Sequence, residues 1–162
     1  SRGLIGFRTE FMTLTRGTGL LNTIFDSWQP WAGPMMRRKN GALVADRKGK
    51  STPYALFAFQ PRGVLFIPPG TPVYEGMIVG EHNRPNDLDV NVTREKKLTN
   101  IRAAGRDENV AVSPHRVLTI ETAMEWIDRD ELVELTPDAI RIRKRILECR
   151  RRPKRGDLRG EE

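Results

Sequence analysis

The apolar stretches of this chain are short, and proline, glycine or charged residues end each of them. The longest covers only residues 54–59, whereas a helix that crosses a membrane needs about 20 apolar residues. Residues 64–67, for example, are closed by Pro68-Pro69-Gly70. Short apolar segments between such turn residues are typical of strands. We therefore expect an α+β fold with a β-rich main part and no membrane-spanning segment.

Local patterns predict the individual elements. Thr52-Pro53 combines a hydroxyl cap with a proline in the first turn, which is typical of a helix start, and Pro61 ends that helix near Gln60. Isoleucines alternate with arginines in residues 140–146, at 140, 142 and 146 against 141, 143 and 145, which predicts a strand with one basic face. Further strands are expected at 42–45, 64–67, 73–74, 77–79 and 132–135, a helix at 121–127, and one long polar loop over 81–109.

The first 30 residues form a separate case. Apolar residues recur at steps of three and four over residues 1–14, which predicts a helix, and residues 20–28 are rich in strand formers. One helix and one strand cannot bury their apolar faces alone. We therefore expect this part to be the end of a domain whose beginning is missing, in a fragment of a longer protein.

The net charge of +7 is concentrated in three segments. Residues 141–162 hold ten Arg or Lys and four acids, residues 37–50 six bases and one acid, and residues 82–106 six bases and three acids. By contrast, residues 121–138 hold seven acids and one base. One basic segment alone is typical of a solvated loop, but three together favour a polyanionic partner such as nucleic acid.

The sequence lacks an enzyme motif. Gly49-Lys50-Ser51 is similar to the end of a phosphate-binding loop, but Val44 stands where that loop requires glycine. One cysteine excludes an intramolecular disulfide, and two histidines argue against a histidine-built metal centre. We expect no catalytic residue, no metal and no cofactor in this chain.

The strongest functional signal is the polar segment 82–102. Its Arg and Lys supply charge for phosphates, and its Asn and Thr supply groups that bond base edges or 2′-hydroxyls. It contains no aromatic residue, so it lacks a stacking surface for single strands, which favours recognition of folded RNA by shape and backbone. The predicted RNA-binding residues are His82, Arg84, Asn86, Asn91, Thr93, Lys96, Lys97, Asn100 and Arg102, with a secondary basic patch of Arg37, Arg38, Lys39, Lys48 and Lys50.

Several blocks of the chain closely resemble the BipA/TypA-type translational GTPases, and they stay in family order. The blocks include Ser1-Arg2-Gly3-Leu4-Ile5-Gly6-Phe7, Tyr74-Glu75-Gly76-Met77-Ile78-Val79-Gly80, Lys96-Lys97-Leu98-Thr99-Asn100 and Asp130-Glu131-Leu132-Val133-Glu134. The resemblance implies that residues 1–32 are the second half of a split-βαβ plait, like domain V of elongation factor G. It also implies that residues 33–148 are the family-specific C-terminal domain, followed by a basic flexible tail at 149–162.

The resemblance also implies a function. This domain would dock in the ribosomal A site, where its long loop contacts large-subunit rRNA and the acceptor end of a tRNA, in ribosome assembly and in translation under stress. GTP and Mg²⁺ would belong to the family's GTPase domain, which is not expected in this chain. A cytoplasmic monomer is expected. The alternative is a protein-interaction module, in which the acidic segment 121–138 binds a basic ribosomal protein.

Overall fold

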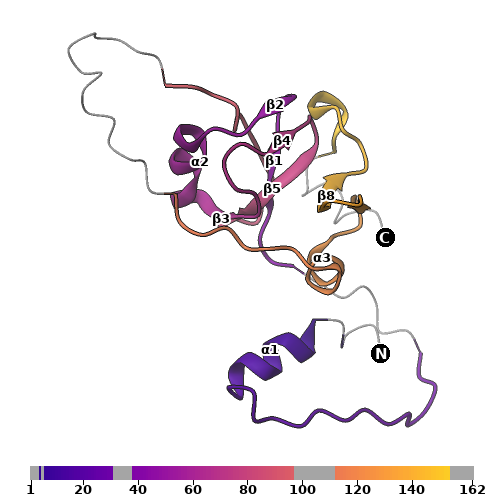
Figure 1. Ribbon diagram of the computed structural model, residues 1–162. Coiled ribbons are helices and arrows are strands. Elements are labelled where there is room, and N and C mark those ends of the chain that lie inside the picture. The colour runs from indigo at the N-terminus through magenta and orange to yellow at the C-terminus, as the bar shows by residue number, and fades with distance from the viewer. Residues whose placement is uncertain (1–3, 5, 31–37, 97–111, 154–162) are drawn as a thin grey trace.

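The structure is a computed structural model that describes residues 4, 6–30, 38–96 and 112–153 (Figure 1). Its helices are α1 (Phe7–Leu14), α2 (Pro53–Phe59) and α3 (Ile120–Trp126), with short 3-10 turns η2 (Gln60–Arg62) and η4 (Cys149–Arg151). Its strands are β1 (Ala42–Ala45), β2 (Gly49–Lys50), β3 (Gly63–Leu65), β4 (Pro72–Val73), β5 (Met77–His82), β6 (Leu88–Val90), β7 (Glu131–Leu135) and β8 (Ile140–Lys144).

One mixed sheet organises residues 38–153. Its strands follow the order β6-β1-β5-β8-β7, and β2 and β4 form a separate small ribbon. Strand β5 is central, because it pairs antiparallel with β1 along one side and with both β3 and β8 along the other. The pair β1–β6 is parallel. The middle of the sheet is thus made of segments far apart in the sequence.

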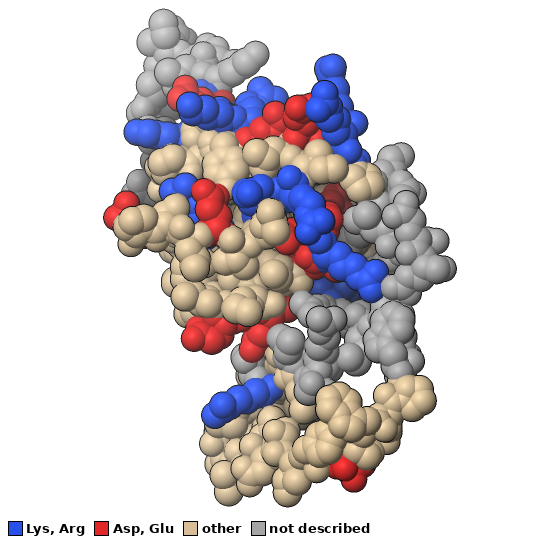
Figure 2. Space-filling model, turned by 90° about the vertical axis from the view of Figure 1, so that its right-hand side faces the viewer, with Lys and Arg blue, Asp and Glu red and all other residues tan. Residues whose placement is uncertain are grey.

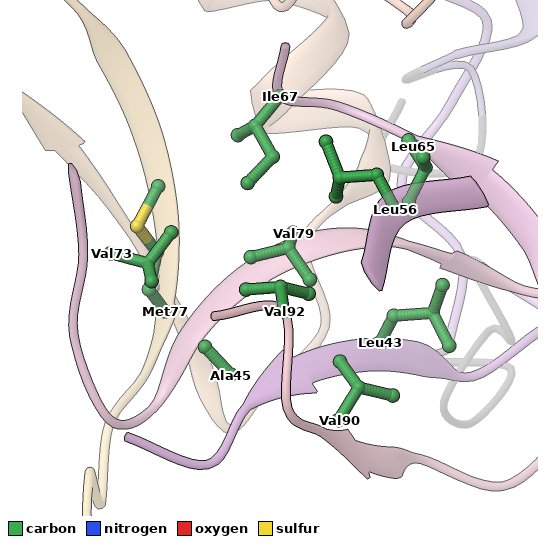
Figure 3. Close-up of a cluster of buried hydrophobic side chains, with 10 residues drawn as sticks. All are labelled: Leu43, Ala45, Leu56, Leu65, Ile67, Val73, Met77, Val79, Val90 and Val92. Atoms are coloured by element: carbon green, nitrogen blue, oxygen red, sulfur yellow. The ribbon is translucent and has the colours of Figure 1, made fainter. Parts of the chain in front are cut away.

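Both faces of the sheet are covered, and α2 and α3 lie on opposite faces (Figure 1). Every residue of β1 is buried, since Leu43 and Ala45 face one core and Ala42 and Val44 the other. A strand covered on both faces is apolar throughout, which is the reason for the run Ala-Leu-Val-Ala. Figure 3 shows the larger core, which gathers Leu43, Ala45, Leu56, Leu65, Ile67, Val73, Met77, Val79, Val90 and Val92.

The sequence prediction of helix α2 is confirmed in detail. The hydroxyl of Thr52 accepts a hydrogen bond from the backbone N–H of Ala55, and Pro53 occupies the first turn. Ala55 and Leu56 are buried, whereas Tyr54 and Phe57 are exposed. The helix therefore anchors one face in the core and presents an aromatic face to solvent. The strands predicted around it, and helix α3, are also present.

The strand predicted for residues 20–28 is wrong. Helix α1 is present, but residues 18–30 form neither helix nor strand, and Leu20, Ile24 and Trp28 are 90–92% exposed. A strand needs a hydrogen-bonded neighbour, and none pairs with this segment within the described ranges. The described part of residues 1–30 therefore does not bear out the plait, whereas the α+β class and the sheet-based main domain are confirmed.

The single loop predicted for residues 81–109 is also wrong. His82 ends β5, and Leu88–Val90 forms β6, which lies parallel to β1. Residues 97–109 of the predicted loop lie outside the described residues. The described chain around Cys149 also contacts the domain, because its backbone N–H donates to Glu75 and the Arg152 guanidinium pairs with Asp89. In the described ranges, no helix has the length and apolar character to cross a membrane.

Candidate nucleic-acid interface

His82 supports the backbone of the segment that follows it. The side chain is 5% exposed, and its Nδ1 lies 2.6 Å from the carbonyl oxygen of Asn86. The backbone N–H of His82 donates to Gly41, and Gly41 in turn donates to the carbonyl of Arg84 at 2.6 Å. His82 therefore fixes the turn over residues 83–87, whose Arg84 and Asn86 are exposed.

Asn91 and Thr93 form a second fixed turn. The Asn91 Oδ1 accepts hydrogen bonds from the Thr93 backbone N–H at 3.0 Å and from its hydroxyl at 2.9 Å. The cap residue of α2 holds the next stretch, because the Thr52 hydroxyl donates to the carbonyl of Arg94 and its N–H to that of Val92. Residues 91–94 are thus attached to the start of α2.

Three of the predicted RNA-binding residues have exposed side chains. They are Arg84, Asn86 and Lys96. Arg94, which the sequence prediction does not include in the site, is exposed as well, and its guanidinium lies 6.0 Å from the centre of the Tyr54 ring. Lys97, Asn100 and Arg102 lie outside the described residues.

The secondary basic patch contains one residue that is not at the surface. Lys39, Lys48 and Lys50 are exposed, but the side chain of Arg38 is 5% exposed and pairs with Glu131 through two hydrogen bonds of 2.8 and 3.0 Å. Its guanidinium also stacks on Trp126, 3.6 Å from the ring centre. A cation enclosed in this way is not available to a phosphate. Arg37 lies outside the described residues.

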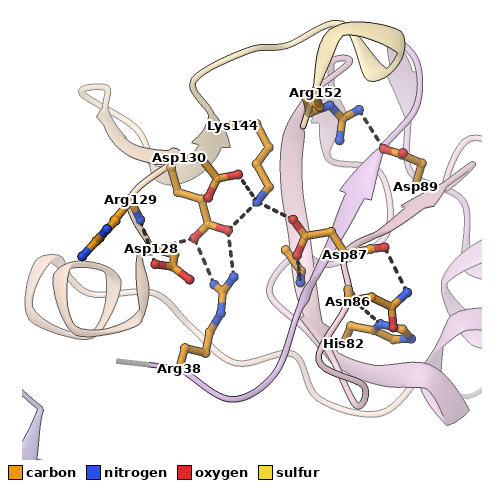
Figure 4. A network of polar contacts seen from close by, with 12 residues as sticks. Arg38, His82, Asn86, Asp87, Asp89, Asp128, Arg129, Asp130, Lys144 and Arg152 are labelled. Atoms are coloured by element: carbon orange, nitrogen blue, oxygen red, sulfur yellow. Dashed lines mark hydrogen bonds and ion pairs between the residues drawn. The ribbon is translucent and has the colours of Figure 1, made fainter. Parts of the chain in front are cut away.

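A buried charge network links the turn after β5 to β7 and β8 (Figure 4). The Lys144 Nζ lies 2.6 Å from Asp87, 2.8 Å from Asp130 and 2.9 Å from Glu131. Lys144 is 2% exposed, and Glu131 also holds Arg38. Burial alone would lower the pKa of Lys144, but the carboxylates of Glu131 and Asp87 outweigh it and raise that pKa above its usual value. Lys144 therefore stays charged and ties Asp87, beside the predicted RNA-binding residue Asn86, to the sheet.

Sequence reasoning misses this network. In the sequence, the acids at 128–131 favour a turn exposed to solvent. Lys144 belongs to the basic segment 141–162, which gives no sign that its side chain is buried. One signal is present: the alternation over residues 140–146 points Ile142 and Lys144 to the same face, and Ile142 is fully buried. A lysine in register with a core residue indicates a buried partner.

Glu81 provides a second, smaller centre of polar contacts. It accepts hydrogen bonds from Asn40, from the indole N–H of Trp126 at 3.2 Å and from Arg116 at 2.9 Å. Partial burial acts to raise the pKa of Glu81, but these donors outweigh it and lower that pKa below its usual 4.5.

We expect Glu81 to contribute stability that acid removes. Because its pKa is lower in the folded state, its contribution is complete above pH 4.5 and is lost as the pH falls through the folded value. The urea midpoint of Glu81→Gln is therefore expected to fall less than that of the parent chain between pH 6 and pH 3. Equal acid dependence of the two chains would contradict this role of Glu81.

Figure 2 shows that charge alone does not mark an interface on the face that it displays. Lys and Arg lie there beside Asp and Glu, so the positive charge is interleaved with negative charge. Within the described ranges, no group of His, Cys, Asp and Glu has the arrangement of a metal site. Residues 47–74 are one of the stretches that carry cations and no acid in sequence; they contain Arg47, Lys48, Lys50 and Arg62.

Comparison with known proteins identifies the domain. Residues 40–149 match the family model "TypA/BipA C-terminal domain". Three relatives carry the name "Large ribosomal subunit assembly factor BipA": those of Bacillus subtilis strain 168 (50% identical over 95% of this chain), Salmonella typhimurium (53% over 96%) and Escherichia coli K12 (55% over 91%). The matched part is 24–26% of each relative, so the chain spans about a quarter of their length.

The match covers the sheet domain from Asn40 to Cys149 and most of the contacts described above, while Arg38 and Arg152 lie just outside it. It falls on the C-terminal domain of the family and not on a GTPase domain, in agreement with the missing phosphate-binding loop at Val44. The sequence blocks, the sheet domain and the relatives lead to one conclusion: the chain belongs to the BipA/TypA family and carries its C-terminal domain.

Proposed function

We propose that this chain is the ribosome-docking part of a BipA/TypA-type translational GTPase, acting in assembly of the large ribosomal subunit and in translation under stress. The observation that carries the proposal is the match over residues 40–149, together with relatives named as large ribosomal subunit assembly factors. In this proposal the domain binds large-subunit rRNA and the acceptor end of an A-site tRNA through segment 82–102.

The geometry of that segment supports an RNA contact. Its described part is held at three places, by His82, by the Asn91 turn and by Thr52, while Arg84, Arg94 and Lys96 point cations into solvent. Cations on a fixed backbone lose little conformational freedom on binding phosphates. The arrangement fits a surface that docks on RNA without first folding.

The alternative, a protein-interaction role for the acidic segment 121–138, has less support. Glu131 and Asp130 are paired with Lys144, and Glu134 accepts a hydrogen bond from the Tyr74 hydroxyl. Carboxylates held by internal partners are not available to a basic protein. Segment 121–138 therefore presents less negative charge than its sequence indicates.

The remaining parts of the proposal follow from the family. GTP and Mg²⁺ are bound by another domain of the parent protein, and this chain needs no cofactor to contact RNA. The chain acts in the cytoplasm and as a monomer on the ribosome.

Replacing Arg84, Arg94 and Lys96 by glutamine is expected to weaken binding to purified large ribosomal subunits by more than about tenfold at moderate salt. The slope of the logarithm of the binding constant against the logarithm of salt concentration should fall by about 0.9 for each phosphate contact removed. Binding is measured by co-sedimentation over a salt series.

The matched control replaces three other exposed cations, Arg145, Arg150 and Arg151, by glutamine. This variant has the same net charge, so a general loss of attraction to RNA affects both equally. Equal weakening of the two triple variants would contradict a specific role for segment 82–102.

A further inference from the structure

We propose that the exposed face of α2 is a stacking site for unpaired RNA nucleotides, with Tyr54 and Phe57 as the rings that the bases contact. This inference rests on the proposed function, which is RNA binding by the domain. It adds that part of the bound RNA is unpaired. It also amends the expectation of folded RNA, which depends on the absence of aromatic residues from segment 82–102.

The two rings lie on one face of the helix. Tyr54 and Phe57 are three residues apart, so they are neighbours on the helix surface, and they are 36% and 52% exposed. In residues 38–96 and 112–153, these are the aromatic residues among the large exposed apolar side chains. Trp126, by contrast, is half-buried and already packs against Arg38 and Phe66. The rings of Tyr54 and Phe57 expose apolar surface to water, which is unfavourable in the free protein. They are therefore available to a binding partner.

The chemistry around the rings fits a nucleotide. The guanidinium of Arg94 lies over Tyr54, and that of Arg62 lies 5.9 Å from the ring centre of Phe59, at the other end of α2. Both arginines are exposed. Stretch 47–74, which contains α2, carries four cations and no acid. Aromatic faces with cations beside them bind the bases and the phosphates of a single strand at once.

The position of α2 joins this face to segment 82–102. Thr52, which caps α2, holds the carbonyls of Val92 and Arg94, so the aromatic face begins where the described part of that segment ends. Leu56 fixes the opposite face of the helix in the core (Figure 3), and Ala55 beside it is buried as well. The rings are thus presented on a rigid support beside the predicted phosphate contacts.

The test uses the full chain and two labelled RNA probes, an unstructured single strand and a blunt duplex of the same composition. The variant Tyr54→Leu/Phe57→Leu keeps apolar side chains and helix propensity but removes both π-faces. We expect it to bind the single strand about tenfold more weakly, with unchanged duplex binding and an unchanged salt slope, in fluorescence anisotropy. Tyr54→Phe, which keeps the ring, should bind both probes like the parent chain.

Met124→Leu on α3 is the control, because Met124 is 56% exposed on the other face of the sheet; it should change neither affinity. Unchanged single-strand affinity of the leucine pair, or equal loss for the duplex, would overturn the stacking site. If the leucine pair instead loses binding to ribosomal proteins freed of RNA, this face of α2 docks protein. That result would also overturn the stacking site.

The failure of the proposed function has a different signature. If the triple glutamine variant of Arg84, Arg94 and Lys96 keeps full binding to large subunits, the ribosome-docking role of segment 82–102 fails, whatever the leucine pair does. If that variant loses binding and the leucine pair keeps its single-strand affinity, the stacking site alone fails.

Discussion

Lys144→Met is expected to lower the free energy of unfolding by about 3–5 kcal/mol, because it leaves buried carboxylates without their cation. Lys144 is 2% exposed and contacts Asp87, Asp130 and Glu131. Methionine preserves the length and most of the volume of the side chain, so the loss reports charge rather than a cavity. The measurement is urea denaturation at neutral pH, followed by far-ultraviolet circular dichroism.

Arg145→Met is the matched control, since Arg145 is the next residue and is exposed. It should change stability by less than about 0.5 kcal/mol. A loss for Lys144→Met below about 1 kcal/mol would show that the three carboxylates find other partners or take up protons. Because the pKa of Lys144 is raised, its contribution is complete below its usual value of 10.5 and is lost as the pH rises through the folded value.

Gly41→Ala is expected to destabilise the domain by about 3 kcal/mol, at the upper end of the cost of overpacking. A Cβ at this position would lie 2.0 Å from the carbonyl oxygen of Asn86 and 2.9 Å from the backbone N of Asp87. Both are backbone atoms, so the whole turn over residues 83–87 has to move. That movement strains the hydrogen bonds of Gly41 to His82 and Arg84 and shifts Asp87 from Lys144.

Gly70→Ala separates this steric effect from backbone strain. Gly70 has φ of +81°, and a Cβ added there would have nothing within 4 Å of it. Its substitution therefore carries only the cost of the left-handed conformation, about 1–2 kcal/mol. Thermal and urea unfolding of the two variants give the comparison. Equal losses of stability in the two variants would show that the turn over residues 83–87 can move at little cost. The close approach at Gly41 would then contribute nothing to stability.

Elements with local causes were predictable from the sequence. The cap and proline at Thr52-Pro53 fixed the start of α2, and apolar runs between turn residues located β1, β5 and β7. Residues 20–28 show the limit of this reasoning: they carry strand formers, but a strand exists only with a neighbour to pair with. Residues 88–90 show the reverse, since Leu88–Val90 lies in a segment predicted as a loop and becomes β6 because β1 offers it a parallel edge.

The candidate site was predictable in composition and not in placement. Arg84, Asn86 and Lys96 are exposed, as expected for charged and polar side chains. Arg38 and His82 are not, and their roles depend on Glu131, 93 residues away from Arg38, and on the carbonyl of Asn86. The proposed stacking residues Tyr54 and Phe57 lie beside segment 91–94 because Thr52 holds that segment at the start of α2. Contacts between distant segments leave no local pattern in the sequence.

The order of the strands has a consequence for synthesis of the chain. Strand β8 pairs with β5 on the same side as β3 and also pairs with β7. The central strand β5 can pair with β1 and β3 but lacks this third neighbour until residues 140–144 have been made. Until then Ile78 and the carboxylate of Asp87 are without Ile142 and Lys144, their partners in the folded domain. Folding dominated by such distant pairings is slow, because the chain must close long loops first. We expect the nascent domain to remain open, and sensitive to proteases and chaperones, until its C-terminal strand leaves the ribosome that made it.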